Sequence, residues 1–364
     1  QNLTTTSGSV VIGADAMGNA TTDKWQVVIG QKAMYNHPAG AASEQTVAIG
    51  FKAMYQSAAH STSGNVAIGG SAAYQITTGG NSVYVGYNSG YNVTVGSANT
   101  MVGRHSGNKI NSGSENAFLG YGAGWHTTGS YNTFIGSRAG YGGTTSAPYS
   151  SGQNNTAVGY QALTAFTTGG SNVVVGYTAG DAITTGAYNV LIGANAGGAI
   201  VTGDTNILIG GNAGKNVTVN SNIGIGHNSL GGNTSTQMNS TGNTVIGSGA
   251  GENMIGGAQY NTLYGLSAAD SLTTGDYNFI AGWAAATTLT TGGGNTVMGS
   301  QANVSANDAV NQIVIGSGSL GHGDNIAVIG NTSTTAWHPA DDNGVDLGAT
   351  NYRFANLYVA DVQM

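Results

Sequence analysis

Apolar residues recur along this chain in short runs, and a glycine closes each run. The segment from Asn189 to Gly193 reads Asn-Val-Leu-Ile-Gly, and close variants precede and follow it at a spacing of 17 residues. Taking the closing Gly as a marker gives 19 copies between Gly13 and Gly330, most of them 16 or 17 residues apart. A short fixed period of this kind predicts a solenoid, in which each rung stacks only on its neighbours.

The two residues before each marker are apolar in all 19 copies, apart from a single Gly. In a strand these two positions point to opposite faces. A solenoid of one chain needs only its inner face apolar, so a second apolar face requires a cover. We expect that cover to be another copy of the same chain, which makes the pattern a prediction of an oligomer.

Other positions of the repeat predict the rest of the rung. Ala or Ser stands three residues after every marker, which indicates close backbone approach, and a Gly such as Gly197 often follows, as a turn of positive φ requires. A weaker apolar position lies seven after the marker, for example Ile183, and introduces a Thr-Thr-Gly turn. Asn stands four before the marker in 13 of 19 copies, which predicts a hydrogen-bonded amide ladder. The predicted rung is strand, tight turn, short second strand and tight turn.

These features predict an all-β, parallel β-solenoid of about 90 Å, with hardly any helix. Residues 1–330 form the repetitive shaft, and the aromatic-rich residues 331–364 are expected to form a C-terminal cap or neck. Longer steps in the repeat indicate inserted loops. Two of them, Tyr141–Gln153 and Gly231–Thr241, are the expected places for binding specificity, because loops vary without disturbing the stack.

Composition narrows the function classes. The chain has 364 residues with 63 Gly, no Cys and 6% charged residues, which indicates an extended, repetitive structural protein. Eight scattered Lys and Arg argue against a nucleic-acid partner, and no apolar run reaches the ~18–20 residues of a membrane span. Without Cys, disulfides and thiolate metal sites are excluded.

No residue pattern predicts catalysis. The carboxylates that lie closest in sequence, Asp270 with Asp276 and Asp341 with Asp342, are read as turn and cap residues. The histidines have no metal-binding spacing, although a trimer axis could bring together three copies of His105. His322 is the second such candidate. We expect no enzyme activity, no cofactor and no metal.

Aromatic residues directly after the marker would project at one azimuth of the rod. They suit stacking on sugars or contact with a protein receptor, or they fill grooves between protomers. The candidate contact residues are Phe51, Tyr87, Tyr121, Tyr160, Tyr177 and Trp283. Ice binding by Thr rows is not expected, because the Thr pairs precede Gly in turns.

The segments Thr46–Gly50 and Asn65–Gly69, which read Thr-Val-Ala-Ile-Gly and Asn-Val-Ala-Ile-Gly, resemble the repeated strand of the heads of trimeric autotransporter adhesins. The resemblance covers most of residues 9–330. It implies a left-handed parallel β-roll packed as a homotrimer about a fibre axis.

The tail segments Val345–Gly348 and Tyr352–Tyr358 are similar to a segment of phage tail fibres and spikes that precedes a self-cleaving chaperone of the endosialidase type. The chaperone is absent here, and a chain ending at Met364 is what its release would leave. This resemblance implies a virion tail fibre that contacts other tail or fibre proteins and a glycan or protein receptor on the host cell.

The sequence therefore favours a structural, homotrimeric phage tail fibre that contributes to host-surface attachment. One alternative is a bacterial extracellular adhesin or filament, located outside the cell or on its surface. The third is a polysaccharide depolymerase with a site between chains.

Overall fold

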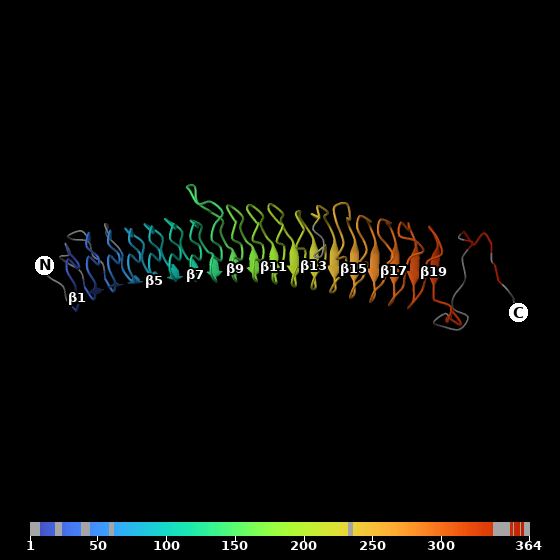
Figure 1. The fold of residues 1–364 in the computed structure, drawn as a ribbon, viewed down its shortest axis with the longest axis horizontal. Coiled ribbons are helices and arrows are strands. Elements are labelled where there is room, and N and C mark those ends of the chain that lie inside the picture. Colours follow the sequence, from blue (N-terminus) through green and yellow to red (C-terminus); the bar gives the residue numbers. More distant parts are fainter. Residues whose placement is uncertain are drawn as a thin grey trace.

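The protein is an elongated rod built from short parallel strands (Figure 1). The computed structural model describes residues 8–18, 24–37, 44–57, 62–231, 236–337, 350–351, 353–356 and 358–359. Within them, 19 strands form one parallel sheet without any helix, and so no helix there could cross a membrane. The predicted all-β parallel β-solenoid is confirmed.

Every strand has three residues and ends directly before one of the 19 marker glycines. The strands are β1 (Val10–Ile12), β2 (Val27–Ile29), β3 (Val47–Ile49), β4 (Val66–Ile68), β5 (Val83–Val85), β6 (Thr100–Val102), β7 (Ala117–Leu119), β8 (Thr133–Ile135), β9 (Thr156–Val158), β10 (Val173–Val175), β11 (Val190–Ile192), β12 (Ile207–Ile209), β13 (Ile223–Ile225), β14 (Thr244–Ile246), β15 (Thr262–Tyr264), β16 (Phe279–Ala281), β17 (Thr296–Met298), β18 (Ile313–Ile315) and β19 (Ala327–Ile329).

Each strand pairs with the strand of the next rung at the same position of the repeat. Leu191 in β11 lies opposite Leu208 in β12, for example, and the register is equally strict between β1 and β2. Strands stacked at ~4.8 Å give a rod of about 90 Å, as the repeat count predicts. Because the register never slips, each position of the repeat forms a straight row along the rod.

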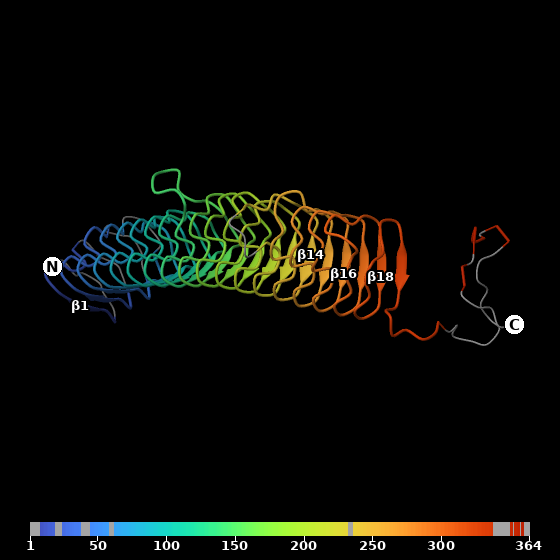
Figure 2. The ribbon, with the colours of Figure 1, turned by 45° about the vertical axis from the view of Figure 1, so that its right-hand side comes forward.

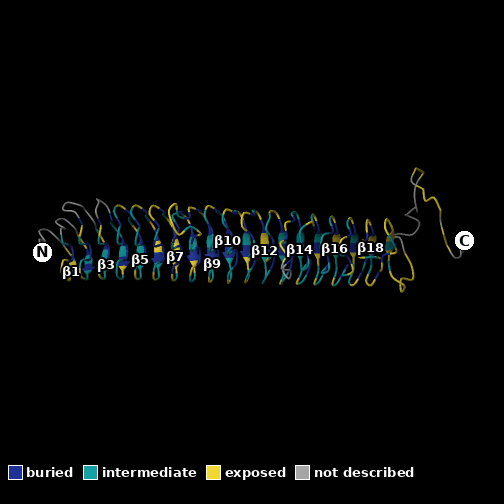
Figure 3. Ribbon diagram, turned by 45° about the horizontal axis from the view of Figure 1, so that its top comes forward, coloured by how far each residue is buried: buried dark blue, intermediate teal, exposed yellow. Residues whose placement is uncertain are grey.

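Within a strand the middle residue is buried and its two neighbours are partly or fully exposed (Figure 3), so the middle side chain lies on the inner face and the other two on the outer face. Leu191 is fully buried, whereas Ile192 keeps 37% of its surface exposed. All strands between β1 and β19 bury the middle residue, and in the two terminal strands it is partly covered. The prediction that the apolar residues before each marker lie on opposite faces is confirmed.

The predicted second strand of the rung is wrong. The apolar residue seven after the marker is buried as expected, as at Ile183, but its segment forms turns. Isolated bridges outside the strands occur at four places in the described residues, for example between Thr127 and Ser150. The Thr-Thr-Gly sequence bends the backbone too sharply for a ladder, although single bonds such as Thr184 N–H to the Val201 carbonyl (2.8 Å) still join the rungs.

Two features make the marker glycine obligatory. At Gly193 φ is +134°, a conformation that side chains rarely tolerate, and an added Cβ would lie 2.4 Å from the carbonyl oxygen of Gly210 in the next rung. The small residue three positions later is fully buried, as at Ala196. The close approach predicted from these small residues therefore occurs within the rung stack of one chain.

In several rungs, core volume is shared between the middle strand residue and the residue four after the marker, so that a large residue at one position faces a small one at the other. Beside Phe118 this second position is Gly124, where an added Cβ would lie 2.4 Å from the Phe118 ring. Where the strand carries Gly224, the second position is the fully buried Leu230. Large and small residues thus alternate in complementary pairs, which keeps the core close-packed.

The predicted asparagine ladder is present. The Asn189 backbone N–H and side-chain amide both donate to Asn172 Oδ1, at 3.0 and 3.1 Å, and the amide also donates to the Gly203 carbonyl at 2.8 Å. Asn206 repeats the pattern one rung later. At Ser82 the ladder continues through a hydroxyl, which accepts the Asn99 N–H at 3.0 Å. The ladder satisfies the buried backbone of the turn before each strand.

Two predicted segments lie partly or wholly outside the described residues. Most of the expected C-terminal cap or neck, including residues 338–349 and 360–364, lies outside the described residues, so the cap or neck stays a prediction. Residues 232–235 of the expected loop Gly231–Thr241 are also outside. The other inserted loop, Tyr141–Gln153, is described and projects from the rod near β8 and β9 (Figure 2).

Candidate binding surfaces

The six aromatic residues after the marker are all exposed on this chain, with exposed fractions between 40% for Tyr121 and 58% for Tyr177. They do not form one continuous row. Tyr160 and Tyr177, on adjacent rungs, stack with ring centroids 5.5 Å apart. Phe51 and Trp283 have no such neighbour at this position, because Gly70 and Ser300 occupy it on the following rungs. A role in glycan or receptor contact stays a prediction for these residues.

A cation fills the gap between two of these aromatics. Arg104 occupies the same position on the rung between Tyr87 and Tyr121, and its guanidinium carbon lies 5.9 and 6.0 Å from their ring centroids. Lys52, the next residue along the chain after Phe51, places its Nζ 5.2 Å from the Phe51 ring centroid. Cation–π contacts at exposed sites contribute about 0.5–1 kcal/mol each, so this face is ordered as well as exposed.

A second aromatic row, five residues after the marker, was not predicted from the sequence. Tyr55, Tyr74 and Tyr91 stack on consecutive rungs with centroid distances of 5.1 and 4.7 Å. Tyr35 extends this stack by one rung at 5.7 Å. The row is visible in the sequence, because its members all stand five residues after a marker glycine. It was missed because the predicted contact residues stand one residue after the marker.

The two histidines considered for a metal site lie in different surroundings. His105 stacks on Trp125 with centroids 4.2 Å apart, and burial, Arg104 and Lys109 lower its pKa. His322 is exposed. No group of three or more metal-ligating side chains occurs among the described residues.

Two of the carboxylates considered for catalysis hydrogen-bond to neighbouring groups of the rung stack, one to the adjacent rung and one within its own turn. Asp276 accepts the Gln259 backbone N–H at 2.6 Å, and Asp270 accepts the Ser271 hydroxyl at 3.2 Å. These contacts match the interpretation as turn residues. Asp341 and Asp342 lie outside the described residues.

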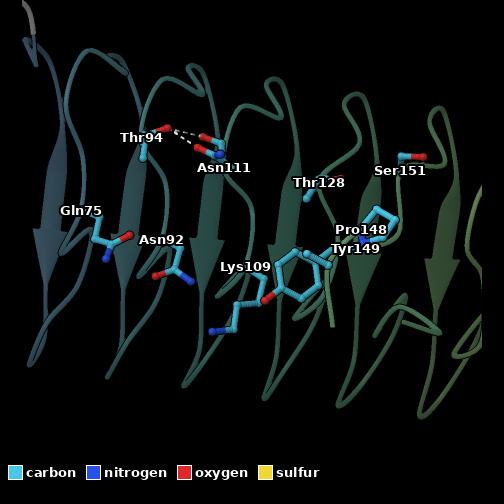
Figure 4. A pocket seen from close by; sticks show the side chains of 10 residues that line it. Gln75, Asn92, Thr94, Lys109, Asn111, Thr128, Pro148, Tyr149 and Ser151 are labelled. Atoms are coloured by element: carbon cyan, nitrogen blue, oxygen red, sulfur yellow. Dashed lines mark hydrogen bonds between the residues drawn. The ribbon is translucent and has the colours of Figure 1, made fainter. Parts of the chain in front are cut away.

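A groove of about 510 Å³ lies beside the inserted loop (Figure 4). Side chains from three consecutive rungs line it, namely Gln75, Asn92 and Lys109, and the loop closes one end with Pro148 and Tyr149. No lining residue belongs to a strand. The groove therefore lies on the turn segments of the rungs, and predicting it required knowing where the loop folds.

Neither protein-family models nor the sequences of curated proteins match this chain.

Proposed function

We propose that the chain is the shaft of a structural homotrimeric fibre, a phage tail fibre that contributes to host-surface attachment. The observation that carries this proposal is the outward face of the sheet. Along it, residues such as Val173 and Ile192 keep 39% and 37% of their surface exposed on a single chain. The apolar row repeats on every rung, and a lone chain would leave it in water.

The size of this face supports association. Three residues of ~3.3 Å rise and a rod of about 90 Å define an outward face of roughly 900 Å². The largest apolar patch on an ordinary monomer is about 300–600 Å². A stable interface buries about 800 Å² per partner, so the face is large enough for one.

The regular spacing favours another copy of the chain as the partner. A surface that matches the face along its whole length must present apolar groups at the same rung spacing, and a second copy does so by construction. A hollow of about 230 Å³ over Ala117, between Val102 and Ile135, could accept a projecting side chain of that copy. Three copies, rather than two, are what the resemblance to trimeric adhesin heads implies.

The tail segment is the reason for choosing a phage fibre over a bacterial adhesin or filament. Its resemblance to the segment before an endosialidase-type chaperone concerns residues 345–358, half of which are outside the described residues. Genes for tail and baseplate proteins beside this gene would support the fibre. Genes for a secretion system or an outer-membrane anchor would support the adhesin.

Light scattering coupled to size exclusion tests the assembly directly. We expect the mass of a trimer, and a folded, soluble monomer would contradict the proposal. In the double variant Ile192→Glu and Ile209→Glu, charges on the outward face should break the trimer. The control variant Thr185→Glu with Thr202→Glu places the same two charges on exposed turns of adjacent rungs in the same region and should leave the trimer intact.

A further inference from the structure

The groove beside the inserted loop has a floor of unpaired polar groups at a regular spacing. Gln75, Asn92 and Lys109 stand at the same position of the repeat, six after the marker, on consecutive rungs (Figure 4). Their backbones are held by rung-to-rung hydrogen bonds of 3.0, 3.0 and 2.8 Å. Among the described residues their side chains form no hydrogen bond or ion pair, so their polar ends are available to a ligand.

A second row, eight after the marker, forms a wall that is already satisfied. Thr94 hydrogen-bonds to Asn111 on the next rung, and the Thr128 hydroxyl donates to the Ser150 carbonyl at 3.1 Å. These contacts keep the wall in place when a ligand enters. The groove is thus preformed, with fixed walls and free polar groups on its floor, which lowers the entropic cost of binding.

The inserted loop supplies an aromatic end wall. The Tyr149 ring packs on the His126 ring with centroids 5.8 Å apart, and the Gly143 N–H donates to the Phe166 carbonyl at 2.8 Å. His126 takes the next place in the row of Gln75, Asn92 and Lys109, but it is only 7% exposed. The polar row therefore stops at the loop, where Tyr149 lines the groove.

These features suit a sugar chain. Amide groups donate and accept together, as hydroxyl groups require, and an aromatic ring offers a face to the C–H side of a pyranose. The rung spacing of ~4.8 Å is close to the length that one pyranose adds to an extended glycan. Three polar side chains in a row followed by a ring would thus bind consecutive sugar residues.

The charge of the groove indicates which sugars. Among the described residues that line it, Lys109 is the only charged one. Six of the eight basic residues but only four of the fifteen acidic residues lie in residues 1–140, so this part has a net charge of +2, against −9 for residues 141–364. An anionic ligand is favoured at Lys109 and disfavoured along the acidic remainder of the rod.

We propose that the groove binds an acidic oligosaccharide, with a sugar carboxylate at Lys109, hydroxyl groups at Gln75 and Asn92, and a pyranose ring against Tyr149. This inference deepens the attachment role proposed above and rests on it. The proposed site lies on the turn segments of the rungs. None of its lining residues belongs to the outward sheet face, which is the face proposed for assembly.

An array of acidic and neutral oligosaccharides of three to five residues tests the inference on the intact chain. The acidic set contains oligogalacturonate, alginate, hyaluronan and colominic acid fragments, and the neutral set contains cello-, malto- and xylo-oligosaccharides. We expect an acidic member to bind, and we expect Lys109→Gln and Tyr149→Ala each to weaken that binding about tenfold. Raising the salt concentration should weaken it further.

Lys215→Gln is the matched control, because it removes an exposed lysine from a rung far from the groove. Absence of binding to any acidic member would overturn the inference. Equal binding of neutral members, or equal effects of Lys109→Gln and Lys215→Gln, would overturn it as well. Light scattering on the same samples separates this outcome from a failed trimer: a trimer that binds no acidic sugar leaves the fibre proposal standing.

Discussion

The asparagine ladder makes a strong and graded prediction about stability. The Asn189 side chain donates to Asn172 and to the Gly203 carbonyl, at 3.1 and 2.8 Å. It also accepts two hydrogen bonds from Asn206, at 3.0 and 3.1 Å. Asn189→Ala removes all four bonds and leaves buried groups on both neighbouring rungs without partners.

The expected cost follows from these contacts. A net contribution of about 1 kcal/mol per hydrogen bond gives a destabilisation of roughly 3–4 kcal/mol for Asn189→Ala. Asn189→Ser should cost less, about 1–2 kcal/mol, because a Ser hydroxyl can still accept the next N–H. Ser82 provides the natural precedent, since its hydroxyl accepts the Asn99 N–H at 3.0 Å.

Hydrogen exchange measured by mass spectrometry reports which rungs lose stability in the Asn189→Ala variant. In a solenoid the effect should remain with the altered rung and its neighbours, because rungs contact only adjacent rungs. We expect exchange around Asn206 to rise at least a hundredfold, which corresponds to about 2.7 kcal/mol. The control is Asn195→Ala, which removes a half-buried surface amide bonded to Thr178 and Asn212. Equal exchange in the Asn189→Ala and Asn195→Ala variants would refute the structural role of the ladder.

Three further predictions concern the core. Gly193→Ala should destabilise the folded protein by about 2–3 kcal/mol or more, because its φ is positive and the added Cβ would clash with Gly210. The control in thermal unfolding is Gly198→Ala, since the nearest atom to its added Cβ would lie 3.5 Å away. Gly224→Leu should cost about 1–3 kcal/mol, and adding Leu230→Gly should restore most of the thermal midpoint. The buried Tyr84 hydroxyl makes no hydrogen bond of good geometry among the described residues, and the nearby Ser82 and Asn99 side chains offset its burial only in part, so Tyr84→Phe should stabilise the protein by about 1 kcal/mol at pH 8. Burial raises the pKa of Tyr84 from 10.0 to about 12 in the folded protein. As the pH rises, the unfolded chain therefore loses the Tyr84 proton before the folded protein does, and this favours unfolding. Between pH 10 and pH 12 the native protein should lose stability through this group, whereas the Tyr84→Phe variant should not.

The repeat could be predicted because its physical causes are local. A strand alternates its side chains between two faces, and a positive φ with no room for Cβ requires Gly, as at Gly193. Both signals are visible in one rung, and the 19 copies confirm each other. The second strand around Ile183 was predicted wrongly, because a buried apolar residue is equally compatible with a turn that is bonded from rung to rung.

The groove could not be predicted from the sequence, because its parts come together only in the folded stack. Gln75, Asn92 and Lys109 are 17 residues apart and share no residue type. Tyr149 reaches them through an inserted loop whose path depends on packing against His126. The repeat spacing marks the loop as an insertion and an expected place of binding specificity, but the sequence does not indicate which rungs the loop approaches.

The backbone of the rod is uniform, whereas its surface is not, and this difference separates assembly from recognition. The outward sheet face is apolar on nearly every rung, as at Ile12 near one end and Ile329 near the other, which suits a contact that extends along the whole length. The second aromatic row, from Tyr35 to Tyr91, the cations over aromatic rings and the groove all lie within residues 31–151. Removing the groove side chains should therefore leave the assembly of the fibre unchanged, whereas charges on the outward face should break the assembly and leave each groove in place.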